Sequence, residues 1–175
     1  LLEESGGSGV RMSDIAKATG ISRQAVYLHF PTRADLLTGT ARYMDEARNI
    51  DERLAASREA TGVDRLDFWV EAWGNYIPEI HGVGRALIAM RDTDEAAAAA
   101  WNDRMQAVRH GCEAAVTALK SAGRLMPDYS VEQATDLLWA LLSVEMWEKL
   151  RFECGWSQTA YVAAMQKLAC DSLVS

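Results

Sequence analysis

The sequence has few of the features that mark a secreted, membrane-embedded or metal-dependent protein. Its three cysteines are odd in number and form no CxxC pair, which favours free thiols in a reducing compartment. No apolar run approaches the ~18–20 residues that span a bilayer. The opening "LLEESGG" also lacks the basic start and long apolar stretch of a signal peptide. We therefore expect a soluble cytoplasmic protein with no membrane segment.

Patterns of catalytic residues are missing as well. An enzyme needs a nucleophile with a base, a pair of carboxylates in a cleft, or side chains at metal-ligand spacing. The three histidines are dispersed, and HExxH, GxSxG and a glycine-rich phosphate loop are all absent from the sequence. His81 and His110 are interpreted as ordinary surface or capping residues. We predict no enzymatic activity, no metal and no cofactor.

Only three prolines interrupt long stretches of helical periodicity, and no alternating strand pattern of useful length occurs. The chain of 175 residues is 49% hydrophobic, which is enough for a sizeable core. We predict an all-α protein with a helix-turn-helix segment followed by a larger helical bundle. The expected helices cover residues 12–19, 22–30, 33 to about 62, 64 to about 80, 93–123 (after a short helix at 84–91), 131–153 and 158–172.

The charge is unevenly distributed along the chain. The net charge is −7, yet residues 1–43 hold five Lys or Arg and four Asp or Glu, so the excess of acid lies in residues 44–175. An acidic body repels DNA and leaves any contact with DNA to the N-terminal segment. We predict two domains with these bounds, 1–43 for DNA binding and 44–175 for ligand binding and dimerisation.

The stretch "GISRQAVYLHF", residues 20–30, combines an apolar face with a polar one. On a helix capped by Ser22, the side chains of Val26 and Phe30 fall on one side, where Ile21 adds to them. They can pack on Met12, Ile15 and Ala16 of the preceding short helix, which Gly20 ends in a left-handed conformation. The opposite side carries Arg23, Gln24 and Tyr27.

Two short helices joined by a glycine-containing turn are typical of a helix-turn-helix, whose second helix enters the major groove. Arginine pairs with guanine and glutamine with adenine, while a tyrosine hydroxyl reaches phosphate. A surface helix that merely happens to be polar is the alternative. The inside/outside split favours the helix-turn-helix. Pro31 ends the second helix, and the capping boxes Thr32–Asp35 and Ser130–Gln133 fix two later helix starts.

The segment "SDIAKATGISRQAVYLHFPTRADLL" resembles the DNA-binding segment of the TetR family of transcriptional regulators. The resemblance rests on Ile15-Ala16, Gly20-Ile21-Ser22, Val26-Tyr27, His29-Phe30 and Leu36-Leu37 after Arg33, and it covers about residues 1–48. It implies that Ser22, Arg23, Gln24 and Tyr27 lie on the recognition helix, with Tyr27 and His29 close to the DNA backbone. Arg33, where the family usually has lysine, would bind a phosphate. The full set of DNA-binding candidates is Arg11, Ser13, Ser22, Arg23, Gln24, Tyr27, His29, Thr32 and Arg33.

Two departures from the family pattern concern the start of the chain. Arg11 stands where the family commonly has a Ser or Thr cap, so we expect that helix to be capped by Ser13 or by a backbone group. The first helix of the family is mostly missing from this sequence.

Aromatic and methionine residues follow helical spacing in the acidic body. Core packing explains such stripes by itself, whereas the resemblance implies a small-molecule pocket among these helices. We predict a small, largely apolar or aromatic ligand. The candidate ligand-binding residues are Trp69, Trp73, Tyr76, Met90, Trp101, Met105 and Trp139.

The segment 133–150 is apolar on nearly all sides, which indicates burial on both flanks. Residues 158–172 carry a matching apolar stripe. Burial within the chain is one explanation, and a four-helix homodimer interface, as in the resembled family, is the other. The candidate interface residues are Leu138, Leu141, Leu142, Met146, Tyr161, Met165 and Leu168.

The sequence thus predicts a one-component regulator, most often a repressor, that binds palindromic operator DNA as a homodimer and is released by a small apolar effector. The alternative is a helical small-molecule-binding or protein-interaction module without operator binding. A module that no longer binds operator DNA is expected to have lost the polar face of its recognition helix. This chain keeps Arg23, Gln24 and Tyr27, which favours the regulator.

Overall fold

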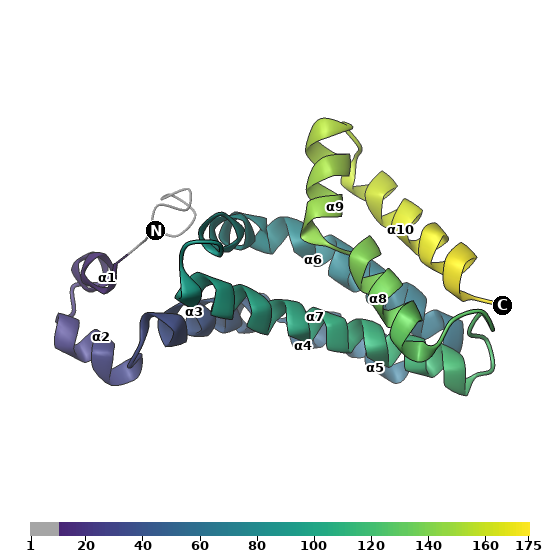
Figure 1. Cartoon of the computed structure of the whole chain (residues 1–175), viewed down its shortest axis with the longest axis horizontal. Coiled ribbons are helices and arrows are strands. Elements are labelled where there is room, and N and C mark those ends of the chain that lie inside the picture. The colour runs from purple at the N-terminus through teal and green to yellow at the C-terminus, as the bar shows by residue number, and fades with distance from the viewer. Residues whose placement is uncertain (1–10) are drawn as a thin grey trace. The chain divides into compact units, whose positions relative to one another are not determined.

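The computed structural model describes residues 11–175, which form α-helices and one π-helical turn joined by turns and short loops (Figure 1). Within that range, β-structure is limited to one isolated antiparallel bridge between Leu125 and Val174. The all-α prediction is confirmed. In chain order the elements are α1 (Met12–Thr19), α2 (Arg23–His29), α3 (Arg33–Ala47), α4 (Ile50–Arg53), α5 (Ala55–Glu59), α6 (Gly62–Met90), α7 (Glu95–Ser121), α8 (Val131–Leu141), α9 (Val144–Glu148), the π-helical turn η1 (Lys149–Glu153) and α10 (Gln158–Leu173).

The chain divides into two compact units that do not follow its order. Unit 1 joins the N-terminal segment up to Arg48 with Ile80–Gln106, and unit 2 joins Asn49–Glu79 with Ala107–Ser175. The long helices α6 and α7 each contribute residues to both units. The functional boundary between residues 43 and 44 remains a prediction, because packing groups the N-terminal helices with parts of α6 and α7.

The boundaries of α1 and α2 follow from local signals. Gly20 ends α1 with a φ of 71°, a left-handed conformation that glycine adopts without steric cost. Ser22 caps α2, its hydroxyl accepting a hydrogen bond of 3.1 Å from the Ala25 amide. Phe30 then caps the C-terminus of α2, directly before Pro31. The predicted helix-turn-helix is present.

Both predicted capping boxes are confirmed. At the start of α3, the Asp35 amide donates to the Thr32 hydroxyl at 3.1 Å while the Thr32 amide donates to the Asp35 carboxylate at 3.0 Å. At the start of α8, Ser130 and Gln133 exchange the same two bonds at 3.0 and 3.1 Å.

The start of α1 does not use Ser13, one of the two expected caps. The helix begins at Met12, and Arg11 occupies the N-cap position. The backbone amide of Arg11 donates to the Asp14 carboxylate at 3.0 Å, so an acidic side chain in the first turn satisfies the helix start. Ser13 is therefore not the cap, and it stays exposed.

The small core of the N-terminal helices contains most of the side chains predicted for it. Met12, Ala16, Val26 and Leu36 are buried together, with Ile15 and Phe30 packed against them. Ile21 was expected to add to this face but is 47% exposed, because it lies in the turn before α2 rather than on the helix.

The helix expected from residue 33 to about 62 is interrupted. α3 ends at Ala47, and Asn49 adopts a left-handed conformation with a φ of 53°. Asparagine tolerates that region better than other non-glycine residues. The short helices α4 and α5 follow it.

The helix expected to end near Ile80 continues through Pro78 to Met90, and the short helix expected at 84–91 is its last part. Proline has no amide hydrogen for the carbonyl four residues earlier, which here is that of Gly74. The Gln158 side chain supplies the missing donor, its Nε2 lying 2.9 Å from the Gly74 oxygen. A contact from α10 therefore compensates for the proline inside α6.

The helix expected at 131–153 is likewise broken, after Leu141. The Ser143 hydroxyl caps α9 by accepting from the Met146 amide at 3.2 Å, and η1 continues to Glu153. α10, which was predicted at 158–172, packs against α8 and η1 and ends at Leu173. The indole of Trp147 donates to Gln158 Oε1 at 2.9 Å, which fixes α9 to the start of α10.

Candidate nucleic-acid interface

The helix α2 has one buried side and one exposed side. Val26 is 3% exposed and anchors the helix in the core of unit 1. Arg23, Gln24, Tyr27 and His29 are all exposed, as is the capping Ser22. The Arg23 guanidinium carbon lies 5.5 Å from the centre of the Tyr27 ring, a cation–π contact that restricts both side chains. The helix thus presents a preformed polar face to solvent.

Five of the predicted DNA-binding residues line one open depression in unit 1. It has a volume of about 570 Å³. Because three of its lining residues carry guanidinium groups, the depression suits an anion. Its lining consists of Arg11, Met12, Ser13, Arg23, Tyr27, Arg33 and Asp94. The remaining candidates, Ser22, Gln24, His29 and Thr32, are exposed but lie outside it.

Arg33 already has a carboxylate partner within unit 1. Its guanidinium forms an ion pair with Asp94, and both side chains are 23% exposed. The other terminal nitrogen of Arg33 lies 3.9 Å from the Met90 sulfur. Sequence reasoning missed Asp94, because no local pattern connects it with a residue 61 positions earlier. The predicted phosphate contact of Arg33 therefore has an intramolecular competitor.

Leu28 is a second residue that sequence reasoning missed. It is 79% exposed and lies one turn after Gln24, on the face that points away from the core. An apolar side chain at such a position can contact the methyl group of thymine. The spacing of four residues from Gln24 is visible in the sequence. Leucine was not among the candidates, because these were polar side chains that can hydrogen-bond to DNA.

Two further arginine pairs join α3 to α7 inside unit 1. Arg42 pairs with Asp103, and Arg104 pairs with Asp45 at 2.6 Å. The hydrogen bond from Arg42 lowers the pKa of Asp103 and raises the pKa of Arg42. A carboxyl group with a lowered pKa stabilises the fold above its unfolded-state pKa, and this contribution is lost as the pH falls through the folded-state pKa. At neutral pH the pair therefore holds α3 against α7.

The predicted ligand-binding residues are distributed over both units. Trp69, Trp73 and Tyr76 are buried in unit 2, and Met90 and Trp101 are buried in unit 1. Met105 and Trp139 are half-buried. Several already have packing partners: the Trp73 indole donates to the Leu142 carbonyl at 2.9 Å, and Trp69 covers Gly111. Their role in ligand binding remains a prediction.

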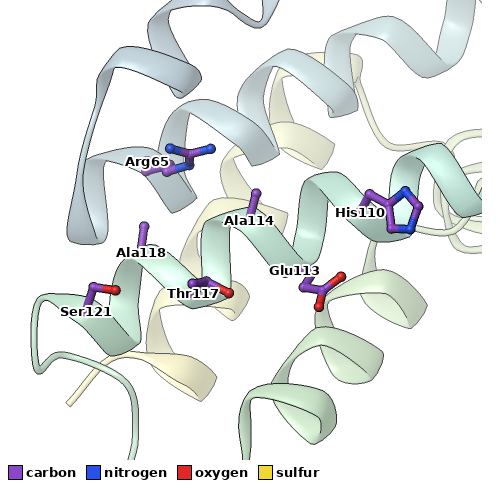
Figure 2. A pocket seen from close by; sticks show the side chains of 7 residues that line it. All are labelled: Arg65, His110, Glu113, Ala114, Thr117, Ala118 and Ser121. Carbon is purple, nitrogen blue, oxygen red and sulfur yellow. The ribbon is translucent and has the colours of Figure 1, made fainter.

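A second hollow, of about 570 Å³, lies in unit 2 between the start of α6 and the C-terminal half of α7. Figure 2 shows Arg65 of α6 facing the side of α7 that carries Ala114 and Ala118. The hollow is open, and none of the predicted ligand-binding residues lines it. Its lining is Arg65, His110, Glu113, Ala114, Thr117, Ala118 and Ser121.

The predicted dimer-interface residues separate into an inner and an outer set. Leu138, Leu142, Tyr161 and Met165 are at most 1% exposed within the chain itself. These four side chains pack inside the chain, and their part in a dimer interface stays a prediction. Leu141 is half-buried, while Met146 and Leu168 are 36% and 45% exposed. Other exposed apolar side chains of α8, η1 and the loop after it are Leu137, Phe152 and Trp156.

The cysteines and acidic groups form no candidate metal centre in the described residues. All three thiols are free, and burial raises the pKa of Cys112 to about 12, so it stays protonated at neutral pH. Among residues 11–175, no cluster of His, Cys, Asp and Glu could hold a metal ion. In the same range, no helix has the length and apolar character needed to cross a membrane.

Comparisons with known proteins give a family match for the N-terminal segment that contains α1 and α2. Residues 1–39 match the family model of bacterial regulatory proteins of the tetR family. The nucleoid occlusion factor SlmA from Marinomonas sp. (strain MWYL1) is 26% identical over 89 residues, which are 51% of this chain and 45% of that relative. The chain therefore matches less than half of the length of this curated relative.

Solved structures extend the likeness to the whole fold. A transcriptional regulator from Saccharomonospora viridis, crystallised with choline, is 19% identical with a TM-score of 0.72, covering 100% of this chain and 92% of that one. The fatty acid degradation regulator FadR from Bacillus halodurans is 20% identical with a TM-score of 0.74, covering 96% and 91%. The chain shares the fold of these regulators.

Proposed function

We propose that this chain, which has the TetR-family regulator fold and a matching DNA-binding segment, binds palindromic operator DNA as a homodimer and acts as a repressor. The observation that carries the proposal is the exposed polar face of α2, backed by Val26 in the core. A small, largely apolar effector bound in the acidic part of the chain releases the DNA. To do so it must favour the state that cannot bind DNA, since equal affinity for both states shifts nothing.

The residues of the interface divide into two roles. In this proposal Arg23 and Gln24 read base edges in the major groove, and Leu28 adds an apolar contact. Arg11, Ser13 and Tyr27 line the depression beside α2 and suit phosphate oxygens. The phosphate contacts weaken as salt rises, whereas the base contacts set the sequence preference.

Replacing Arg23 with alanine tests the reading role. We expect a loss of roughly 1–3 kcal/mol at the preferred site and a relaxed base preference at the position it contacts. Titration of the variant against the preferred duplex and its single-base substitutions measures both effects. Lys17→Ala is a suitable control, because Lys17 is an exposed cation in the last turn of α1, outside the depression. Unchanged affinity and selectivity would remove Arg23 from the reading residues.

Selection of duplexes from a random library, with the full-length protein, tests the function as a whole. Two recognition helices related by a two-fold axis should enrich a palindrome with half-sites about one helical turn, or a multiple of it, apart. Enrichment of no sequence at low salt would instead support the alternative, a helical small-molecule-binding or protein-interaction module without operator binding.

Dimerisation rests on the apolar side chains that α8 and α10 leave exposed. Leu137 and Leu168 are each 45% exposed, and their two helices are in contact. Leu168→Glu should convert the dimer to a monomer at micromolar concentration, because a carboxylate would be buried without a partner. Sedimentation velocity measures the change. Ala163→Glu is the matched control, since Ala163 is exposed on the same helix but points well away from Leu168. An unchanged dimer in the Leu168 variant would move the interface elsewhere.

A further inference from the structure

Asp94 connects the start of α7 to the start of α3. One of its oxygens, Oδ1, accepts hydrogen bonds from the Ala96 and Ala97 amides at 3.0 and 3.3 Å and so caps α7. The other oxygen, Oδ2, forms the ion pair with Arg33. The cap fixes the position of the carboxylate, so Oδ2 is held toward the guanidinium rather than reaching it through a flexible side chain.

A carboxylate and a phosphate present nearly the same partner to a guanidinium group, namely anionic oxygens that accept its N–H donors. Asp94 is the acidic member of a depression that otherwise carries Arg11, Arg23 and Arg33. In that surrounding, its Oδ2 stands where a DNA phosphate oxygen would meet Arg33. Asp94 also adds a negative charge to the lining of this depression.

We propose that Asp94 is a built-in competitor for the phosphate that Arg33 would bind, and that this autoinhibitory contact weakens DNA binding of the free protein. The inference rests on the proposed DNA-binding function. On binding DNA, Arg33 exchanges Asp94 for a phosphate. Breaking the ion pair and placing Asp94 near the duplex both cost free energy, and both costs are independent of DNA sequence.

The surroundings of the ion pair favour regulation over simple support of the fold. Both side chains are 23% exposed, so the ion pair is open to solvent and to a competing anion. α3 is also held to α7 by Arg42–Asp103 and Arg104–Asp45, so the helix does not depend on Arg33 for its place. The second Arg33 contact, with Met90, brings the competition next to a predicted ligand-binding residue.

Asp94→Asn isolates the charge, because asparagine caps a helix about as well as aspartate does. Binding to a fluorescent duplex of arbitrary sequence at low salt is measured by anisotropy for the full chain, Asp94→Asn, Arg33→Ala and the double variant. We expect Asp94→Asn to tighten binding by about three- to tenfold when Arg33 is present. Arg33→Ala should weaken binding more in the Asp94→Asn background than in the wild-type background.

Asp92→Asn is the matched control, since it removes the same charge from the same turn, at a side chain that is 90% exposed. In the Arg33→Ala background, Asp94→Asn should tighten binding no more than Asp92→Asn does. If Asp94→Asn changed DNA affinity equally with and without Arg33, Asp94 would act only through its negative charge, and the proposed competition for Arg33 would be overturned. Failure of both the wild-type protein and Asp94→Asn to bind any duplex would overturn the proposed function itself.

Discussion

Gly111→Ala should lower the free energy of unfolding by roughly 1–3 kcal/mol. The indole of Trp69 lies directly over this glycine, and a Cβ at residue 111 would overlap its outer ring atoms. The ring cannot yield easily, because Trp69 is only 6% exposed and sits in packed surroundings. Inside a helix, alanine is otherwise preferred to glycine by ~1 kcal/mol, so the clash has to reverse the usual sign. Urea unfolding followed by circular dichroism measures the change.

Two variants test whether Trp69 causes this loss. Gly84→Ala places the same substitution inside α6, where a Cβ would lie 3.5 Å from the Trp101 ring, an ordinary van der Waals distance. It should raise stability by ~0.5–1 kcal/mol. Trp69→Phe removes the overlapping ring atoms, so Gly111→Ala should cost less in that background. The same cost in both backgrounds would show that Trp69 is not responsible.

Gln158→Glu should destabilise the protein by roughly 1–3 kcal/mol. Gln158 donates to the Gly74 carbonyl, which Pro78 leaves without its helical partner, and accepts from the Trp147 indole. Glutamate keeps the acceptor for Trp147 but sets a second oxygen against the Gly74 carbonyl, so one partly buried hydrogen bond is replaced by a repulsion between two oxygens. Thermal or urea unfolding of the full chain provides the measurement.

The background Pro78→Ala separates this mechanism from a general effect of the added charge. Alanine restores the amide hydrogen that the Gly74 carbonyl needs, so Gln158→Glu should cost clearly less in that background. Strict additivity of the two substitutions would contradict the compensation. Gln158→Met is a useful companion variant, because it removes both hydrogen bonds without adding a charge.

Gly74 shows how one residue can support two elements at once. A Cβ at this position would lie 3.3 Å from Val162 and 3.6 Å from the Tyr161 ring, so the absence of a side chain lets α10 approach α6 closely. The same approach brings Gln158 to the carbonyl of Gly74. The sequence predicted a helix through Gly74 and Pro78 to about residue 80, and the contact from α10 supports its continuation to Met90.

The positions of the exposed and buried apolar side chains of α8 and α10 were not predictable from helical spacing alone. Both helices carry apolar residues over more than one side. Which side faces the chain's own core depends on the neighbouring helices, which bury Leu138 and Tyr161 and leave Leu137 and Leu168 exposed. The sequence therefore predicted that these two helices form an interface, a prediction that stays open, but it could not choose the outward residues.

The sequence by itself determined the all-α class, the short helices α1 and α2 with the turn between them, and the capping of α3 and α8. These features depend on contacts within about four residues: the cap of Ser22, the left-handed Gly20 and the spacing of Val26 from Arg23. The tertiary structure decided what depends on distant partners. Gln158 carries α6 past Pro78 from 84 positions beyond Gly74, and Asp94 meets Arg33 across 61 positions. Local periodicity holds no information about such pairs, because the fold alone brings their atoms together.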